Sequence, residues 1–237
     1  MIIERPAHAR GHVQAGWLDS RHTFSFGGYY DPAWMGFGPL RVINEDRVDP
    51  GAGFPPHRHA NMEILSYVLA GALSHRDSSG AGGVAEGVIG PGELQWMSAG
   101  HGVEHSEFNA SPSEPVHFLQ IWIQPDRLNA APAYAQRDAT PLADAWTLLA
   151  SPDGRDGSLA IRQDARLLAA RMGAGERLDH PFDPQRRYWL QVVRGAVAFG
   201  ERRLTAGDAL GFVDESAALE LAGGEGGAEV LLFDLPA

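Results

Sequence analysis

Two histidines and a glutamate lie close together in the sequence, at His57, His59 and Glu63. If residues 57–63 form one β-strand, side chains two positions apart point to the same face, so these three would share one wall. Imidazole nitrogen and carboxylate oxygen together suit a divalent cation such as iron, nickel, cobalt, copper, zinc or manganese. One His-x-His pair by itself does not distinguish a metal site from surface or hydrogen-bonded histidines.

A second pair, His105 and Glu107, follows about forty residues later in glycine-rich sequence. On a strand these two side chains also share a face. The two pairs can converge inside one small barrel and supply three imidazoles and a carboxylate, which leaves open positions on a five- or six-coordinate metal. His101 lies between two glycines, and we expect it in a loop beside the site.

Both stretches resemble the paired motifs of the cupin superfamily. The first motif is fitted in register by Gly51, His57, His59 and Glu63, with its closing glycine, Gly71, one residue late. The residue types of the second motif are matched by Gly92, Gly100, His105 and Asn109. Ser98 replaces the proline of that motif, and four residues instead of two separate Gly100 from His105.

These departures are similar to one branch of the cupins, the pirin family. The likeness covers essentially the whole chain, through residues 16–26, 29–32, 40–44, 97–100, 105–107, 120–123 and 231–236. It implies that His57, His59, His105 and Glu107 bind the metal and that Glu63 is a neighbour on the inner wall. The implied cofactor is one divalent cation, with iron expected first and copper, nickel, cobalt, manganese or zinc as alternatives.

Composition favours a chain of strands and turns. The 237 residues are enough for one large or two ordinary domains, and 29 glycines and 16 prolines lie between short apolar runs. No leader or membrane-spanning segment is expected, because no long apolar run is present. Zero cysteines exclude disulfides and fit a cytoplasmic location. The net charge of −11 and the absence of a concentrated basic patch argue against direct nucleic-acid binding.

An internal repeat predicts an all-β tandem cupin (bicupin) with two β-barrel or jelly-roll domains. Residues 67–73 resemble residues 191–197, and residues 92–94 resemble 207–209. In the second half the ligand positions fall on Pro181, Asp183, Arg187, Glu220 and Ala222, and the remaining His180 is one position out of register. We therefore expect a metal-binding domain over residues 1–135, a linker over 136–157, and a carboxy-terminal cupin domain without ligands over 158–237.

Local patterning predicts the individual elements. We expect a hairpin arm over 62–77 with a mobile glycine-rich turn at 78–83, and a short helix near 143–148 in the linker. The strand at 115–124 places Phe118, Gln120 and Trp122 on one face, without showing which face is inward. Further strands are predicted at 23–29, 40–48, 159–163, 187–193, 196–199, 209–213, 218–221 and 230–235.

The resemblance implies a quercetin 2,3-dioxygenase, which opens a flavonol ring with O2 and releases carbon monoxide. The partners are then a small aromatic flavonol and O2, and Glu107 or Glu63 takes the proton of the 3-hydroxyl group. The alternative is a metal- or redox-responsive regulator that binds a protein partner. A cupin without a functional metal is disfavoured, because all four ligand positions are filled. The sequence carries no signal for an assembly, so a monomer is the expectation.

Overall fold

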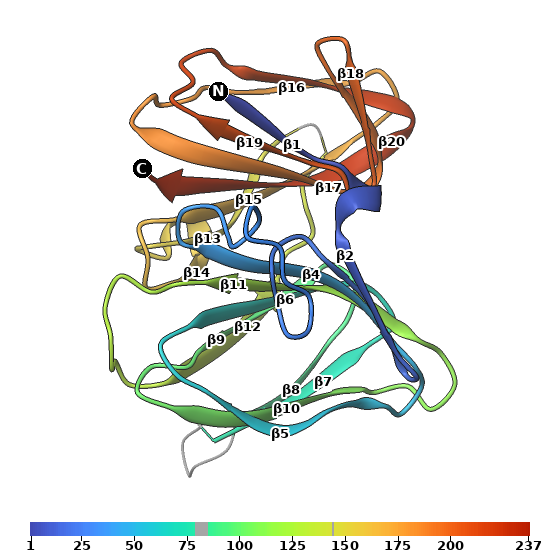
Figure 1. Cartoon of the computed structure of the whole chain (residues 1–237), viewed down its shortest axis with the longest axis vertical. Helices are drawn as coiled ribbons and strands as arrows, with labels where there is room; N and C mark the ends of the chain where they lie inside the picture. Colours follow the sequence, from blue (N-terminus) through green and yellow to red (C-terminus); the bar gives the residue numbers. More distant parts are fainter. Residues whose placement is uncertain (79–84, 144) are drawn as a thin grey trace. The chain divides into compact units, whose positions relative to one another are not determined.

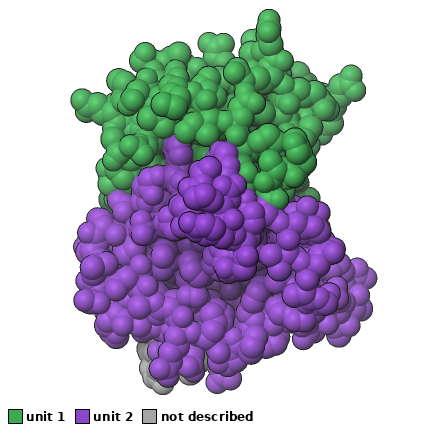
Figure 2. All heavy atoms as spheres, in the orientation of Figure 1, with its two compact units in different colours: residues 1–10, 141–160, 164–237 green, residues 11–140, 161–163 purple. Residues whose placement is uncertain are grey.

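The computed structural model describes residues 1–78, 85–143 and 145–237, and these residues are almost entirely β-structure. Their only helices are two short 3₁₀ turns, η1 (Ala7–Ala9) and η2 (Arg155–Gly157). None of their helices is long and apolar enough to cross a membrane. The chain divides into two compact units, residues 1–10, 141–160 and 164–237 as unit 1 and residues 11–140 and 161–163 as unit 2, coloured separately in Figure 2. The prediction of an all-β bicupin is confirmed.

Unit 2 consists of two antiparallel sheets that face each other (Figure 1). The larger sheet has the order β12-β9-β6-β11-β4-β3-β2, and the smaller has the order β5-β10-β7-β8. The strands are β2 (Gly11–Ala15), β3 (Leu18–His22), β4 (Leu40–Val48), β5 (Gly53–His59), β6 (Glu63–Ala70), β7 (Leu73–Asp77), β8 (Ala85–Ile89), β9 (Glu93–Ser98), β10 (Val103–Asn109), β11 (Val116–Ile123) and β12 (Ala133–Asp138).

The burial of each strand follows its place in unit 2. β6 lies inside the larger sheet between β9 and β11, and its residues from Glu63 to Leu69 are all buried. β7 and β10 alternate between buried and more exposed residues, as expected of strands with one face toward the interior. One apolar cluster of this unit is formed by Val48, Val68, Leu73, Ile89, Val116 and Phe118.

Unit 1 is built on one nine-stranded sheet. Seven of its strands follow the order β1-β19-β17-β20-β15-β13-β14, and the other two, β16 and β18, pair with β20 and β17. Its strands are β1 (Ile2–Arg5), β13 (Thr147–Ser151), β14 (Leu159–Ala160), β15 (Arg166–Met172), β16 (Arg177–His180), β17 (Arg186–Phe199), β18 (Arg202–Thr205), β19 (Ala209–Val213) and β20 (Leu219–Pro236). Its interior is apolar and includes Tyr188, Leu190, Phe212 and Leu232.

Several local predictions differ from the structure. The strand predicted at 23–29 is wrong, because β3 ends at His22 and the chain then forms a loop with an isolated bridge between Phe26 and Tyr29. This loop is closed by Ser25, whose side chain bonds to the backbone of Asp31. Within the predicted turn at 78–83, all residues after Ser78 lie outside the described part of the chain.

The expected helix near 143–148 is also wrong. Thr147 begins strand β13, which pairs with β15, and the Thr147 hydroxyl accepts the backbone N–H of Leu142 at 2.8 Å. Part of the predicted linker is strand as well, since β12 pairs with β9 as far as Asp138. Residues 1–10 group with the carboxy-terminal half because β1 pairs with β19.

Candidate metal centre

Three histidines meet where β5 and β10 pair in an antiparallel ladder. His105 lies directly opposite His57, and His59 is opposite Val103. The ring centroids are 4.3 Å apart for His57 and His105, and 4.8 Å apart for His59 and each of the other two. One nitrogen from each ring lies within 4.8 Å of the others, close enough for all three to bind one metal ion.

A close approach of the two strands produces this arrangement. A Cβ atom at Gly53 would lie 2.3 Å from the backbone oxygen of Glu107, so no other residue fits there without movement. The register of β5 against β10 shifts between His105 and Glu107, as at a β-bulge. The missing side chain at Gly53 and the bulge together bring both motifs into one wall of the barrel.

Two of the three imidazoles, those of His59 and His105, are held in the unprotonated form that metals require. Burial, with the charge of His57 as a further cause, lowers the pKa of His105 to about 2 and that of His59 to about 4. Neither ring nitrogen of His105 has a hydrogen-bond partner, although only 3% of the residue is exposed. His57 Nδ1 lies 2.8 Å from the carbonyl oxygen of Pro55, so Nδ1 carries the hydrogen and Nε2 is left as the ligand atom.

A bound cation therefore fits these residues better than an empty site does. Buried polar atoms in native proteins are nearly always paired, and an unpaired one costs free energy. A divalent ion would satisfy one of the two unpartnered nitrogens of His105, together with His57 Nε2 and one nitrogen of His59. Three neutral imidazoles are a suitable donor set for several divalent metals, so the structure leaves the identity of the ion open.

Glu107 lies beside this triad, with its carboxylate held from two sides. Ser66 Oγ donates to Oε1 at 3.0 Å, and Gln120 Nε2 donates to Oε2 at 2.7 Å. Burial raises the pKa of Glu107 even though both hydrogen bonds act in the opposite direction. A carboxylate oxygen of Glu107 and one ring nitrogen each of His75 and His105 lie within 4.8 Å of one another and form a second group of possible ligands. His105 thus belongs to both this group and the histidine triad.

Glu63 does not share a strand face with His57 and His59, and that prediction is wrong. β5 ends at His59, Asn61 adopts a left-handed φ of 52° in the turn, and Glu63 begins β6 in the other sheet. The Glu63 carboxylate accepts three hydrogen bonds, from Trp96 Nε1, Ser98 Oγ and the backbone N–H of Arg162. It is therefore committed to these donors.

His101 lies in the turn between β9 and β10, with its side chain exposed, as expected of a loop histidine. Its backbone N–H donates to the carbonyl oxygen of Ala130 at 2.8 Å. Within the described residues it belongs to neither group of possible ligands.

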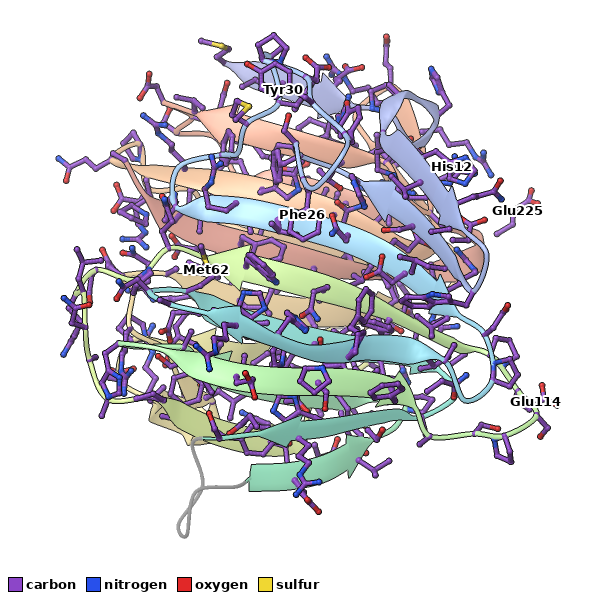
Figure 3. All side chains as sticks on the ribbon, turned by 60° about the horizontal axis from the view of Figure 1, so that its bottom comes forward. His12, Phe26, Tyr30, Met62, Glu114 and Glu225 are labelled. Carbon is purple, nitrogen blue, oxygen red and sulfur yellow. The ribbon has the colours of Figure 1, made fainter. Side chains whose placement is uncertain are left out.

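A cavity of about 310 Å³ opens onto the three histidines. The ring of Trp122 packs edge-on against His59 at 4.7 Å and against Phe26 at 5.2 Å, and Figure 3 labels Phe26 on the loop between β3 and β4. Gln120 and Trp122 face this cavity, which settles the orientation of β11 that the sequence left undecided. The lining consists of Phe26, Asn44, Asp46, Phe54, Pro55, Pro56, His57, His59, His105, Glu107, Gln120 and Trp122.

Sequence reasoning missed a second buried histidine. His75 Nε2 lies 2.7 Å from Asp77 Oδ2, and its Nδ1 accepts from the Gln95 amide at 3.0 Å. The ring of Tyr134 stacks on His75 with centroids 4.9 Å apart. The signal was the alternation along β7, in which Leu73, His75 and Asp77 are the buried residues.

The sequence also matches known families over both halves. Residues 4–123 match the family described as Pirin, and residues 148–235 match the family described as Quercetinase C-terminal cupin domain. The chain belongs to the pirin family. This confirms the resemblance drawn from the motifs, and the first matched segment contains every residue of the candidate metal centre in this pirin.

Relatives of this pirin are similar over their full length. A protein of Escherichia coli K12 named quercetin 2,3-dioxygenase is 45% identical over 236 residues, covering 100% of this chain and 99% of the relative. The crystal structure of the bacterial pirin YhhW from Escherichia coli in complex with nickel(II) has a TM-score of 0.93 at 44% identity and covers 100% of this chain and 99% of its own. A quercetin 2,3-dioxygenase from Acinetobacter baumannii, 20% identical with a TM-score of 0.77, shares the fold, covering 95% of this chain and 84% of its own.

Proposed function

We propose that this chain is a metal-dependent quercetin 2,3-dioxygenase, which cleaves the central ring of a flavonol with O2 and releases carbon monoxide. The observation that carries the proposal is the group of three imidazoles, with ligand atoms within 4.8 Å of one another, that lines an apolar cavity of about 310 Å³. The full-length relative of that name in Escherichia coli, at 45% identity, supports it.

The proposed ligands are His57, His59, His105 and Glu107. One nitrogen from each of the three imidazoles lies within 4.8 Å of the other two. A carboxylate oxygen of Glu107 lies within 4.8 Å of a ring nitrogen of His105. These residues would hold a divalent cation, which would supply Lewis-acid activation of the 3-hydroxyl group of the flavonol and a site for the reaction with dioxygen. Nickel(II) is the ion in the structure of the Escherichia coli pirin, and iron is the ion we expect first from the sequence.

Glu107 is the proposed proton acceptor for the 3-hydroxyl group. It lines the cavity beside the imidazoles that would hold the cation, where a carboxylate can reach a hydroxyl group of the substrate. Ser66 and Gln120 fix its orientation through one hydrogen bond to each oxygen. Glu63, the other candidate for this role, is absent from the cavity lining, and its oxygens are occupied by Trp96, Ser98 and Arg162.

The aromatic wall would hold the planar substrate. Phe26, Phe54 and Trp122 line the cavity and offer flat apolar surfaces, as binding sites for aromatic ligands commonly do. The same residues exclude water from the reacting ring. Fixing the flavonol against the site converts an encounter of separate molecules into an effectively intramolecular reaction, which lowers the entropic part of the barrier.

The test is aerobic consumption of quercetin, followed by its loss of visible absorbance and by detection of carbon monoxide. Protein reconstituted with iron, nickel, copper, cobalt or manganese is compared with metal-free protein. We expect turnover with carbon monoxide release only in the presence of metal. His57→Ala should lose bound metal and activity together, whereas His101→Ala, on the exposed turn, should keep both. Full activity of metal-free protein or of His57→Ala would refute the proposal.

A further inference from the structure

Strand β4 turns two polar side chains toward the cavity that holds the histidines. Side chains alternate along the strand, so Asn44 and Asp46 point inward while Glu45 and Arg47 form an ion pair of 3.2 Å on the opposite face. Asn44 is 3% exposed and Asp46 is 4% exposed, yet both line the cavity. An otherwise aromatic and proline-rich wall thus contains an amide and a carboxyl group.

Both side chains retain unused hydrogen-bonding capacity. The Oδ1 atom of Asn44 is buried and has no hydrogen-bond partner among the residues that the structure describes. Within the described residues, Asp46 receives one side-chain hydrogen bond, which Ser20 Oγ donates to Oδ1. A carboxylate offers about four acceptor positions, so a single donor leaves Asp46 largely unsatisfied.

The neighbouring strand carries the same row of polar side chains. Gln120 of β11 pairs with Asn44 in the ladder, and Ser66 of β6 pairs with Gln120. Gln120 Nε2 donates to Glu107 Oε2 at 2.7 Å, and its Oε1 lies 3.1 Å from Ser66 Oγ, whose single hydroxyl proton is shared with Glu107 Oε1. Within the described residues both ends of the Gln120 amide thus contact polar neighbours, whereas Oδ1 of the next member of the row, Asn44, has no partner.

A third unpartnered group lies on the same wall. Trp122 Nε1 is buried without a hydrogen-bond partner, and Trp122 lines the cavity. Buried polar atoms are rarely left unpaired in native proteins, and binding sites are a recognised exception. Ligand pockets are mostly apolar with a few placed polar groups that fix orientation and specificity, and the cavity here has that composition.

We propose that Asn44 and Asp46 bind ring hydroxyl groups of the substrate away from the reacting 3-hydroxyl, and so make the site selective for polyhydroxylated flavonols. This inference rests on the proposed function and adds the residues that determine specificity. The two groups suit phenolic hydroxyls, which both donate and accept. Asn44 Oδ1 accepts from a phenol, and the Asp46 carboxyl can accept or donate according to its protonation.

The electrostatics of Asp46 agree with this role. Burial raises the pKa of Asp46 to about 7, with the charges of Glu107 and Glu45 acting in the same direction and the hydrogen bond from Ser20 opposing them. A carboxyl group near its pKa at neutral pH is present in both donor and acceptor forms. A phenol can therefore pair with either form without leaving a buried charge unsolvated.

The experiment compares two flavonols that differ only in the distant hydroxyls. Quercetin carries several ring hydroxyls, and 3-hydroxyflavone carries the reacting one alone. Binding to nickel-loaded protein is measured by tryptophan fluorescence in the absence of dioxygen, so that no turnover is needed. The variants are Asn44→Leu and Asp46→Leu, with Asp46→Asn as a shape-conserving second variant. The control is Arg47→Ala, on the outer face of the same strand.

Wild-type protein should bind quercetin roughly tenfold or more tightly than 3-hydroxyflavone. One hydrogen bond to a buried partner changes the dissociation constant by about tenfold. Asn44→Leu and Asp46→Leu should remove most of this preference by weakening quercetin binding alone. Asp46→Asn should weaken it several-fold, and Arg47→Ala should leave it unchanged. Unchanged metal content and unfolding midpoint would show that a variant is folded.

The outcomes separate the two proposals. If wild-type protein binds both flavonols and the preference for quercetin survives in all variants, the inference is wrong and the proposed function stands. The inference is equally wrong if the variants weaken both flavonols in parallel, or if wild-type protein shows no preference. If wild-type protein binds neither flavonol, the proposed function fails and the inference fails with it.

Discussion

At the scale of single residues, two buried glutamates show that neighbours decide the role of a carboxylate. Glu63 is 1% exposed and Glu107 is 2% exposed, so burial alone does not distinguish them. Glu63 accepts hydrogen bonds from Trp96, Ser98 and Arg162. Glu107 lines the cavity beside the imidazoles. The oxygens of Glu63 are therefore occupied by its three donors, whereas Glu107 faces the cavity.

The hydrogen bond from Gln120 should matter for metal affinity. Gln120 Nε2 donates to Glu107 Oε2 at 2.7 Å, and Gln120→Leu removes that donor from a buried carboxylate. Partners of metal ligands typically contribute 10–100-fold to affinity, so we expect a loss of roughly that size in chelator competition. Gln14→Leu, at an exposed position, serves as the control and should have no effect. Equal affinity in Gln120→Leu and wild type would exclude Glu107 from the metal centre.

Asp46 should make stability depend on pH. Its pKa is raised from 3.8 to about 7, mainly by burial. Between these two pKa values, Asp46 is protonated in the folded state and ionised in the unfolded state. The contribution of its protonation to the free energy of unfolding is therefore fully present below about pH 4 and is lost as the pH rises through about 7. Asp46→Asn removes this loss, so in urea unfolding of metal-free protein it should gain roughly 1–3 kcal/mol over wild type between about pH 4 and about pH 8.

The control for this measurement is Asp49→Asn, at an exposed aspartate just after β4. Asp49 is exposed and is absent from the cavity lining, so this variant controls for the general effect of replacing an aspartate by asparagine. A constant difference from wild type for Asp46→Asn over the same pH range would mean that Asp46 is solvated in the folded protein.

At the scale of strands, the alternation of apolar and polar residues predicted some strands well. It failed where pairing with a strand distant in sequence determines the end of a strand and the sheet to which it belongs. The strand at 40–48 is observed with the same bounds, because alternating apolar residues recur along it. The single strand over 57–63 is in fact two strands in different sheets, separated by a turn at Asn61. The sequence shows the residues of that turn, but the sheet that receives Glu63 is set by pairing with β9 and β11.

The proposed metal ligands are more visible in the sequence than the residues around them. His57, His59 and His105 stand out as motif positions, since residues two apart on a strand share a face without any distant information. Asn44 and Asp46 lie on a correctly predicted strand, yet nothing in their spacing shows that a cavity faces them. His75 was overlooked because its partners, Asp77 on its own strand and Gln95 on β9, acquire meaning only when the two sheets face each other.

Gly53 should be required for the approach of β5 to β10. A Cβ there would lie 2.3 Å from the backbone oxygen of Glu107, which neither strand can accommodate without shifting. We expect Gly53→Ala to cost roughly 1–3 kcal/mol in urea unfolding, as other overpacked positions do, and to weaken metal binding. Gly226→Ala, where an added Cβ meets nothing within 4 Å, is the matched control in a strand. Equal stability of the two variants would show that the strands adjust freely.

At the scale of the whole molecule, one fold is used twice with different interiors. In unit 2 the interior contains histidines, Glu107 and a cavity, whereas the core of unit 1 is filled by side chains such as Tyr188, Phe212 and Leu232. The repeat was readable from the sequence, because it depends on matched glycines and residue types. The grouping of residues 1–10 with unit 1 was not, because it depends on the pairing of β1 with β19.

The distribution of possible metal ligands between the two units predicts about one metal ion per chain. The groups of possible ligands found in the described residues all belong to unit 2. His180, the histidine nearest to the register of the lost ligands, instead packs its ring against Trp146, Phe182 and Tyr188, and burial lowers its pKa. Elemental analysis should give about one ion per chain for wild type and for His180→Phe, and close to none for His59→Ala. A second ion that disappears in His180→Phe would mean that unit 1 also binds metal, through donors that become ligands only when the ion is present.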